Sequence, residues 1–232
     1  VSKEIFDREA LLGVSITGWM NNPEVLFNEK ILEKGAKIVK EVNRQVADII
    51  GINPAARTTC VKPSGNASVL LQTASGIHAE HSPRYIRNIQ MNKESEITQA
   101  IVKSNPYMVE ESVWSANGTD VVISFPIVPH KGSMYKEELY GVKHLELVAK
   151  AQKHWVIAGT NEELCADEGV RHNVSNTIIV DDWDEVEKYV FENRYSFSGI
   201  SFLSMSGDKD FNQAPNTAVI DDKQMVKKYG PA

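Results

Sequence analysis

The sequence predicts an α/β protein that contains parallel strands. A long amphipathic helix is expected over residues 22–51, because a proline follows an asparagine cap at its start and a glycine stands at its end. Toward the carboxyl end, a strand at 173–180, a helix that opens at Asp182 and a strand at 199–205 follow one another. This alternation favours crossover connections between parallel strands.

The middle of the chain is expected to form a pair of strands with a helix between them in sequence. Residues 85–91 and 120–127 are apolar and β-prone, and we expect them to pair with each other, with a helix over 94–104 between them. A further helix over 142–158 should bury the face that carries Leu145, Val148, Ala151 and Trp155.

The end of the chain is polar from about residue 206, and residues 206–232 are expected to be irregular. We find no repeat, low-complexity tract or linker that divides the sequence. Residues 1–232 are therefore expected to form a single region with a polar tail.

Composition excludes several classes of protein. The net charge of −6 and the absence of a basic stripe argue against a nucleic-acid partner. No apolar run approaches the roughly 18 residues of a membrane span, and the first residues lack a signal-peptide pattern, so we expect a cytoplasmic protein with no membrane partner. Cys60 and Cys165 lie far apart with no ligand spacing around them, so neither a disulfide framework nor a metal site is expected.

The most informative local pattern is a turn between a strand and a helix. Residues 57–61 are rich in β-branched side chains, and residues 67–72 resemble a helix start. Unpaired amides at such a start, a glycine and small hydroxyls suit a phosphate. The candidate binding residues are Pro63, Ser64, Gly65, Asn66, Ala67 and Ser68. Spacing alone leaves open the plainer interpretation, in which Ser64 or Asn66 caps the helix and Pro63 shapes a turn.

Other reactive side chains are expected to be structural. His78 and His81 form an HxxH pair without further ligands at metal-binding spacing, so we expect a structural or substrate-edge role. Cys60 should behave as a small apolar residue, although Lys62 nearby could activate its thiol. The acidic residues around Cys165 are expected to form a solvated face.

Several stretches together resemble one family, the monomeric class II ribonucleoside-triphosphate reductases that use adenosylcobalamin. They occur in the expected order over nearly the whole chain. The stretches are LGVSITG (12–18), TTCVKPSG (58–65), SGIH (75–78), YIR (85–87), LELV (145–148), QKHWV (152–156), HNVSNT (172–177), SGISFL (198–203) and QAP (213–215).

The resemblance implies a fold and a site. The family's fold is a ten-stranded α/β barrel, and this chain is similar to its carboxyl-terminal part. In the family, the loop that matches residues 63–68 holds the phosphates of the substrate, which favours the phosphate interpretation of this loop. No residue is assigned to the corrin or to catalysis.

The resemblance also implies the reaction of the complete enzyme. Ribonucleoside triphosphates are reduced to the deoxyribonucleotides needed for DNA replication, by a thiyl radical that adenosylcobalamin initiates and with electrons from a thioredoxin-like reductant. The family's radical cysteine lies in an Asn-Pro-Cys-Gly-Glu-like motif that these 232 residues do not contain. We therefore expect this part to be inactive without the amino-terminal part of the reductase. Two alternatives are a non-catalytic remnant or partner chain that retains the barrel fold, and an unrelated phosphate-binding α/β enzyme.

Overall fold

The computed structural model describes residues 2–205, 211–219, 221, 223 and 226. The chain folds into two compact units. The first unit comprises Val1–Glu80 and His130–Met205, and the second comprises His81–Pro129 and Ser206–Ala232. Each unit is considered by itself, and the expectation of a single region stays a prediction.

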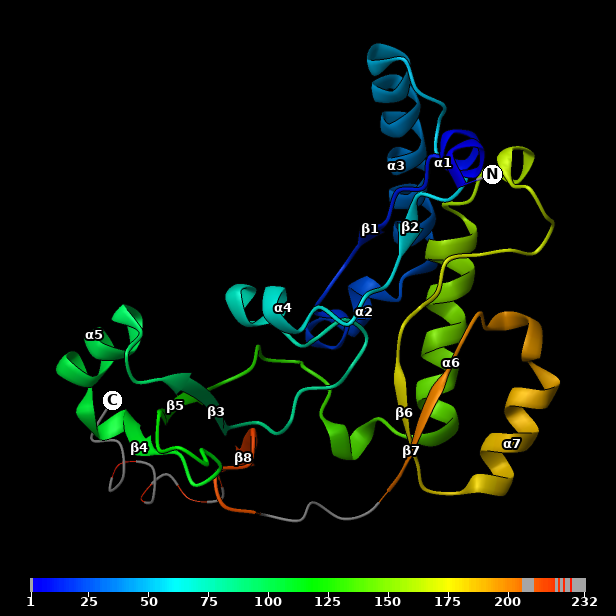
Figure 1. The fold of residues 1–232 in the computed structure, drawn as a ribbon. Helices are drawn as coiled ribbons and strands as arrows, with labels where there is room; N and C mark the ends of the chain where they lie inside the picture. Colours follow the sequence, from blue (N-terminus) through cyan, green and yellow to red (C-terminus); the bar gives the residue numbers. More distant parts are fainter. Residues whose placement is uncertain (1, 206–210, 220, 222, 224–225, 227–232) are drawn as a thin grey trace. The chain divides into compact units, whose positions relative to one another are not determined.

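The strands of the first unit pair in parallel (Figure 1). Strand β1 (Val14–Ser15) pairs with β2 (Thr59–Cys60), and β6 (Thr177–Val180) pairs with β7 (Ser201–Ser204). A parallel bridge between Val61 and Val174 joins the extensions of β2 and β6. The parallel crossover predicted from the sequence is confirmed, because helix α7 (Trp183–Glu192) connects β6 to β7.

The long amino-terminal helix predicted over residues 22–51 is two helices. Helix α2 (Pro23–Leu26) ends at Leu26, and α3 (Glu29–Ile50) begins after Asn28, whose side chain accepts a hydrogen bond from Ile31 N at 3.2 Å. Periodicity continues across this break because both helices present apolar residues to the core. The predicted end is confirmed, since Gly51 follows α3 in the left-handed conformation with φ 73°.

Helix α6 (Gly141–Ala151) continues as a π-helix over Gln152–Ile157. Its predicted apolar face is confirmed, because Leu145, Val148, Ala151 and Trp155 are all buried. Helix α7 begins as predicted at Asp182, whose carboxylate accepts hydrogen bonds from the amides of Asp184 and Glu185. The remaining helices of this unit are α1 (Ser2–Glu9), α4 (Gly65–Leu71) and the 3₁₀ turns Trp19–Asn21, Lys136–Glu138, Glu162–Leu164 and Arg194–Ser196.

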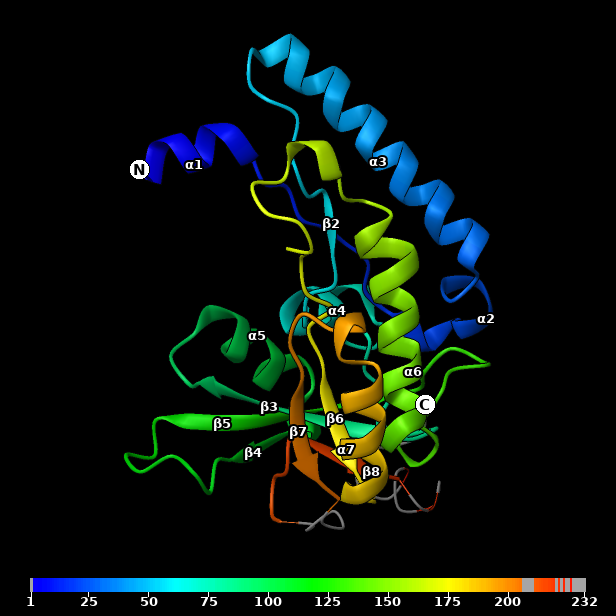
Figure 2. The ribbon, with the colours of Figure 1, turned by 90° about the vertical axis from the view of Figure 1, so that its right-hand side faces the viewer.

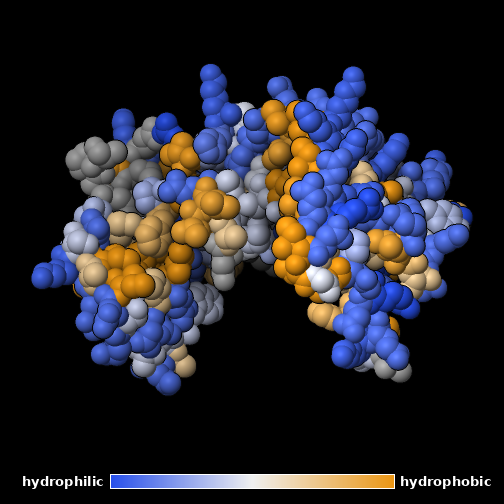
Figure 3. All heavy atoms as spheres, turned by 90° about the horizontal axis from the view of Figure 1, so that it is seen from above, coloured by the Kyte–Doolittle hydropathy of each residue, from blue (hydrophilic) through white to orange (hydrophobic). Residues whose placement is uncertain are grey.

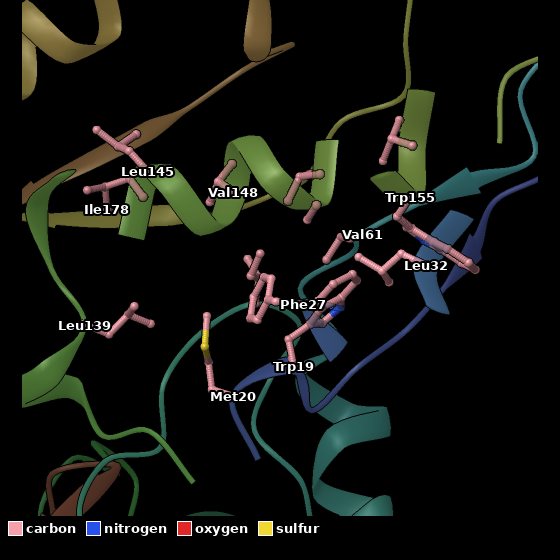
Figure 4. Close-up of a cluster of buried hydrophobic side chains, with 14 of the residues drawn as sticks. Trp19, Met20, Phe27, Leu32, Val61, Leu139, Leu145, Val148, Trp155 and Ile178 are labelled. Carbon is pink, nitrogen blue, oxygen red and sulfur yellow. The ribbon is translucent and has the colours of Figure 1, made fainter. Parts of the chain in front are cut away.

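The hydrophobic core of the first unit lies between helices α3 and α6 and the parallel strands (Figures 2 and 4). Figure 4 shows Trp19 and Phe27 facing Leu32 and Val61, and the two rings are 5.2 Å apart. Because these contacts join segments that are distant in sequence, the helices fix where the end of β2 lies.

The second unit is an antiparallel sheet with the strand order β4-β5-β3-β8. Strand β3 (Tyr85–Asn92) pairs along its whole length with β5 (Asp120–Ile127), which confirms the predicted pairing. Helix α5 (Glu96–Ser104), the 3₁₀ turn Pro106–Met108 and β4 (Val109–Glu111) lie between them in sequence. The polar tail was expected to be irregular, but β8 (Asn216–Ala218) pairs with β3. Most of the rest of the tail lies outside the described residues.

An apolar groove lies on the surface of the first unit. It has a volume of about 560 Å³ and runs along α3, with α1 and residues 10–14 on its other side. The side chains of Val42 and Val46 in its floor are 51% and 47% exposed. Figure 3, which views the protein from above, shows bands of apolar residues on that face.

Within the described residues, no helix combines the length and the apolar character that a membrane span requires.

Candidate functional site

The candidate phosphate loop follows the end of β2 and opens helix α4 (Figure 1). Ser68 N donates to Ser64 O at 2.7 Å, which is the first hydrogen bond of this helix. The amides that precede Ser68 in the first turn have no carbonyl within the helix to bind. Pro63 and Gly65 are exposed, and nothing lies within 4 Å of the place where a Cβ of Gly65 would stand. The loop therefore reaches the protein surface.

The hydroxyl groups of the loop are used inside the protein. Ser64 Oγ donates to Thr17 Oγ1 at 2.5 Å, and Ser68 Oγ donates to the carbonyl of Gly65 at 3.0 Å. Ser68 is buried, whereas Ser64 is half-buried. Because each hydroxyl has a single proton, neither serine hydroxyl has a hydrogen left for an anion, whereas the backbone amides of the first turn and the side chain of the exposed Lys62 can donate.

A second turn, residues 73–76, supports the loop. Gly76 has a φ of +52°, and a Cβ at this position would stand 2.6 Å from the carbonyl oxygen of Lys62. Only glycine permits this backbone to lie so close to the start of the loop. The buried Asn21 holds the same turn, because its Oδ1 accepts a hydrogen bond from Ala74 N at 2.6 Å.

Sequence reasoning did not single out Thr17 or Asn21. Thr17 stood within the LGVSITG stretch, but nothing in its local pattern shows that it contacts a loop 47 residues away. Asn21 lies beside a predicted helix cap, and its amide nitrogen donates instead to Glu80 Oε1 at 2.7 Å and to Ser133 Oγ at 3.0 Å. These are long-range contacts, which only the fold reveals.

Two hydrogen bonds hold His78 within the first unit. Its Nε2 accepts a hydrogen bond from Thr177 N at 3.1 Å, so its Nδ1 carries the proton and donates to Ser75 O at 3.0 Å. Burial lowers the pKa of His78. His144 packs edge-on against it, with ring centres 6.1 Å apart, and its Nε2 donates to Ile77 O. Burial, with the neighbouring His78 as a second cause, lowers the pKa of His144 to about 4.

The HxxH pair does not form a metal site within the described residues. His81 belongs to the second unit, where its ring contacts Tyr85 at 5.6 Å between ring centres. Across the ranges that the structure describes, no three histidine, cysteine or acidic side chains gather as metal ligands.

Cys60 lines a pocket next to the loop. The pocket has a volume of about 400 Å³, and its other lining residues are Leu11, Leu12, Gly13, Val61, Lys62, His172, Asn173 and Ser175. Burial raises the pKa of the Cys60 thiol, and the positive charge of Lys62 opposes this only in part. The thiol is therefore protonated at neutral pH, as the structural interpretation of Cys60 predicts.

Cys165 lies in a separate environment with the acidic cluster. Burial is also the main cause that raises the pKa of its thiol. Two acidic neighbours pair with arginines: Glu162 with Arg171 at 2.5 Å and Glu163 with Arg44 at 3.7 Å. Glu162 and Glu163 are exposed, which agrees with a solvated face.

No protein-family model matches the chain. The chain is 26% identical over 224 residues to the adenosylcobalamin-dependent ribonucleoside-triphosphate reductase of Euglena gracilis, a match that covers 94% of this chain and 28% of the relative. A probable reductase of the same name from Dictyostelium discoideum is 29% identical over 172 residues, or 74% of this chain and 21% of the relative. A crystal structure of a B12-dependent (class II) ribonucleotide reductase matches 99% of this chain and 35% of its own, with a TM-score of 0.80 and 18% identity.

This chain is similar in sequence and in fold to one region of these reductases. The resemblance recognised in the sequence is confirmed, and the match to the class II reductase shows a shared fold of mixed helix and sheet. The chain spans about a quarter of the length of the curated relatives it matches. Because the structural match covers 99% of this chain, it extends over both units and over the loop at residues 63–68.

Proposed function

We propose that this chain is part of an adenosylcobalamin-dependent ribonucleoside-triphosphate reductase, and that its loop at residues 63–68 holds the phosphates of the substrate. The homologues carry this activity in their names, and one of them matches 94% of the chain. The observation that carries the proposal is the exposed first turn of α4, with open space beside Gly65 and Lys62 next to it. Backbone amides and an ammonium group together suit the charge of a triphosphate.

The parallel strands support the finer proposal that the first unit belongs to a ten-stranded barrel. Strands β1 and β2, the bridge from Val61 to Val174, and strands β6 and β7 are all parallel. Strand β7 is exposed along its length, and Leu203 within it is 57% exposed. Exposed apolar strands of this kind need further strands or helices to cover them. The amino-terminal part of a reductase is the partner that we propose for them and for the groove along α3.

Adenosylcobalamin belongs to this proposal as the cofactor of the complete enzyme, where it would supply the radical that starts the reaction. No set of described side chains identifies a surface for the corrin, so we place no reaction step on this chain. A thioredoxin-like reductant is likewise proposed for the complete enzyme. Within the proposal, this chain binds and orients the phosphates of the substrate.

A binding experiment tests the loop. Ser64→Asp combined with Gly65→Val, made in the full-length protein, should weaken the binding of a ribonucleoside triphosphate at least tenfold, because a negative charge and a branched side chain both obstruct an anion. Ser104→Asp adds the same charge on the exposed face of α5 and should leave the affinity unchanged. Isothermal titration calorimetry gives both values. Unchanged affinity in the loop variant would remove the phosphate assignment.

An activity assay separates the proposal from a non-catalytic remnant. The full-length protein should form deoxyribonucleotide only when adenosylcobalamin and a dithiol reductant are both added. If triphosphate binds and no deoxyribonucleotide forms under any of these conditions, the remnant is the better interpretation.

A further inference from the structure

Thr17 is the centre of a small hydrogen-bond network beneath the loop. Its Oγ1 accepts hydrogen bonds from Ser64 Oγ at 2.5 Å and from Gly76 N at 2.9 Å, and it donates to the carbonyl of Ala74 at 3.0 Å. A hydroxyl has one proton to donate and two lone pairs to accept. Thr17 therefore uses its whole hydrogen-bonding capacity on the loop and on the turn below it.

Ser15 acts in the same way on the residue before Pro63. Its Oγ accepts a hydrogen bond from the backbone amide of Lys62 at 2.9 Å. Ser15 is the last residue of β1, and Thr17 lies two residues beyond it. Together they hold Lys62 and Ser64, the two residues that flank Pro63.

The bond between Ser64 and Thr17 decides which groups face an anion. Because Ser64 gives its only proton to Thr17, its oxygen cannot also donate to a phosphate. The amides of the first turn of α4 do not depend on that proton. Fixing the Ser64 side chain in this direction also fixes the backbone from which those amides project.

We propose that Thr17 is a positioning residue for the phosphate loop, which it holds by accepting a hydrogen bond from Ser64 Oγ. This inference rests on the proposed function of the loop. A purely structural alternative exists, in which Thr17 matters only because it binds Gly76 and Ala74. The two differ in a measurable way, since only the first makes the effects of Thr17 and Ser64 depend on each other.

A double-mutant cycle on the full-length protein tests the inference, with inorganic triphosphate as the probe. Thr17→Val keeps the shape of the side chain and removes the hydroxyl. Ser64→Ala removes the hydroxyl that donates the hydrogen bond to Thr17. We expect each variant to weaken triphosphate binding about three- to tenfold, and the double variant to be no weaker than Thr17→Val alone. Thr17→Ser keeps the hydroxyl and should retain the affinity of the parent protein.

Each outcome has one meaning. Normal affinity in Ser64→Ala with weak binding in Thr17→Val, or additive effects of the two changes, would overturn the inference and support the structural alternative. Ser64→Ala removes no bond to the turn at 73–76, so it remains informative if Thr17→Val does not fold.

Gly65→Val serves as the reference variant, because it tests the phosphate site without touching Thr17 or Ser64. If it abolishes binding while neither Thr17→Val nor Ser64→Ala has an effect, the inference is wrong and the proposed function stands; if it has no effect, the proposed function itself is wrong.

Discussion

The two units differ in how their strands pair and in which segments of the chain cover them. In the second unit, β3 and β5 are separated in sequence by α5, a 3₁₀ turn and β4, and they pair over eight residues each. In the first unit, β2 pairs with β1 from 45 residues earlier, Val14 lying opposite Thr59, and helices from distant segments cover the strands. Apart from β8, the strands of the antiparallel sheet come from one segment of the chain, residues 85–127, whereas the parallel strands of the first unit come from residues 14–60 and 177–204.

The two units also differ in which apolar surfaces remain exposed. The first unit has a packed core on one side and the exposed strand β7 and the apolar groove along α3 on others. Parallel strands are usually buried on both faces. The first unit is therefore where we expect the rest of a reductase to dock, and the second is where the chain should be more self-sufficient.

The largest expected effect comes from a matched pair of core substitutions. Ile178 in β6 and Ile123 in β5 are both fully buried, one in each unit. Replacing either by alanine should lower the free energy of unfolding by about 2–5 kcal/mol. Amide hydrogen exchange should show lost protection only in the unit that carries the substitution. Equal loss in both units after Ile178→Ala would break the comparison, because it would make the whole chain one cooperative structure.

Acid should weaken the first unit through its buried histidines. The folded pKa of His144 is about 4, below the 6.5 of an exposed histidine, so the unfolded state binds the proton more tightly. The free energy of unfolding should therefore fall as the pH drops from 6.5 toward 4, by about 3 kcal/mol for this residue. The lowered pKa of His78 acts in the same direction.

The control for this prediction is His144→Gln, which can still donate to Ile77 O and does not titrate. Urea denaturation at several pH values should show a shallower pH dependence in this variant. An unchanged pH dependence would mean that other groups cause the acid sensitivity of the first unit.

Glycine substitutions should distinguish tight packing from an open turn. A Cβ at Gly159 would stand 2.0 Å from Thr59 Oγ1, so Gly159→Ala should cost about 1–3 kcal/mol by forcing the π-helix away from β2. Gly118 in the second unit has open space around it and a φ of +61°, and Gly118→Ala should cost only about 1 kcal/mol. Thermal melts of both variants measure these two losses of stability. A smaller loss at Gly159 than at Gly118 would contradict the packing seen in the first unit.

The smallest expected effect on stability concerns the groove along α3. Val42→Ser with Val46→Ser should change the free energy of unfolding by less than about 0.5 kcal/mol per site, because both side chains are half exposed. Because an exposed apolar groove favours association between copies, we expect residues 1–232 to self-associate and the same change to reduce this in sedimentation velocity. Ile97→Ser on the exposed face of α5 is the matched change in the second unit. If the valine variant unfolded readily, the groove would be part of the unit's own core.

Much of the fold was predictable because its signals are local. The Asp182 cap and the buried face of α6 follow from spacing within each segment, and β3 and β5 each carry an apolar, β-prone run that favours their pairing. The break at Asn28 was missed because apolar periodicity runs through it. Strand β8 was missed because its three residues are ordered by pairing with β3 and carry no strand pattern of their own.

The site was predictable only in part. The sequence marks the glycine and the turn at residues 63–68, but it does not show that Ser64 and Ser68 donate their protons inside the protein. Thr17 and Asn21 reach the turn at 73–76 across more than 50 residues. Contacts of that range depend on how the helices pack, which no short pattern encodes.

The π-helix at Gln152–Ile157 has a consequence for how this chain tolerates changes in length. Gln152 donates to His172 O at 2.9 Å, Trp155 Nε1 donates to Cys60 O at 3.0 Å, and Thr59 Oγ1 donates to Trp155 O at 2.6 Å. Removing one residue here would restore α-helical spacing, so that Gln152 and Trp155 could no longer both meet these partners. Natural variants should thus accept exchanges of residue type in this turn far more readily than a gap.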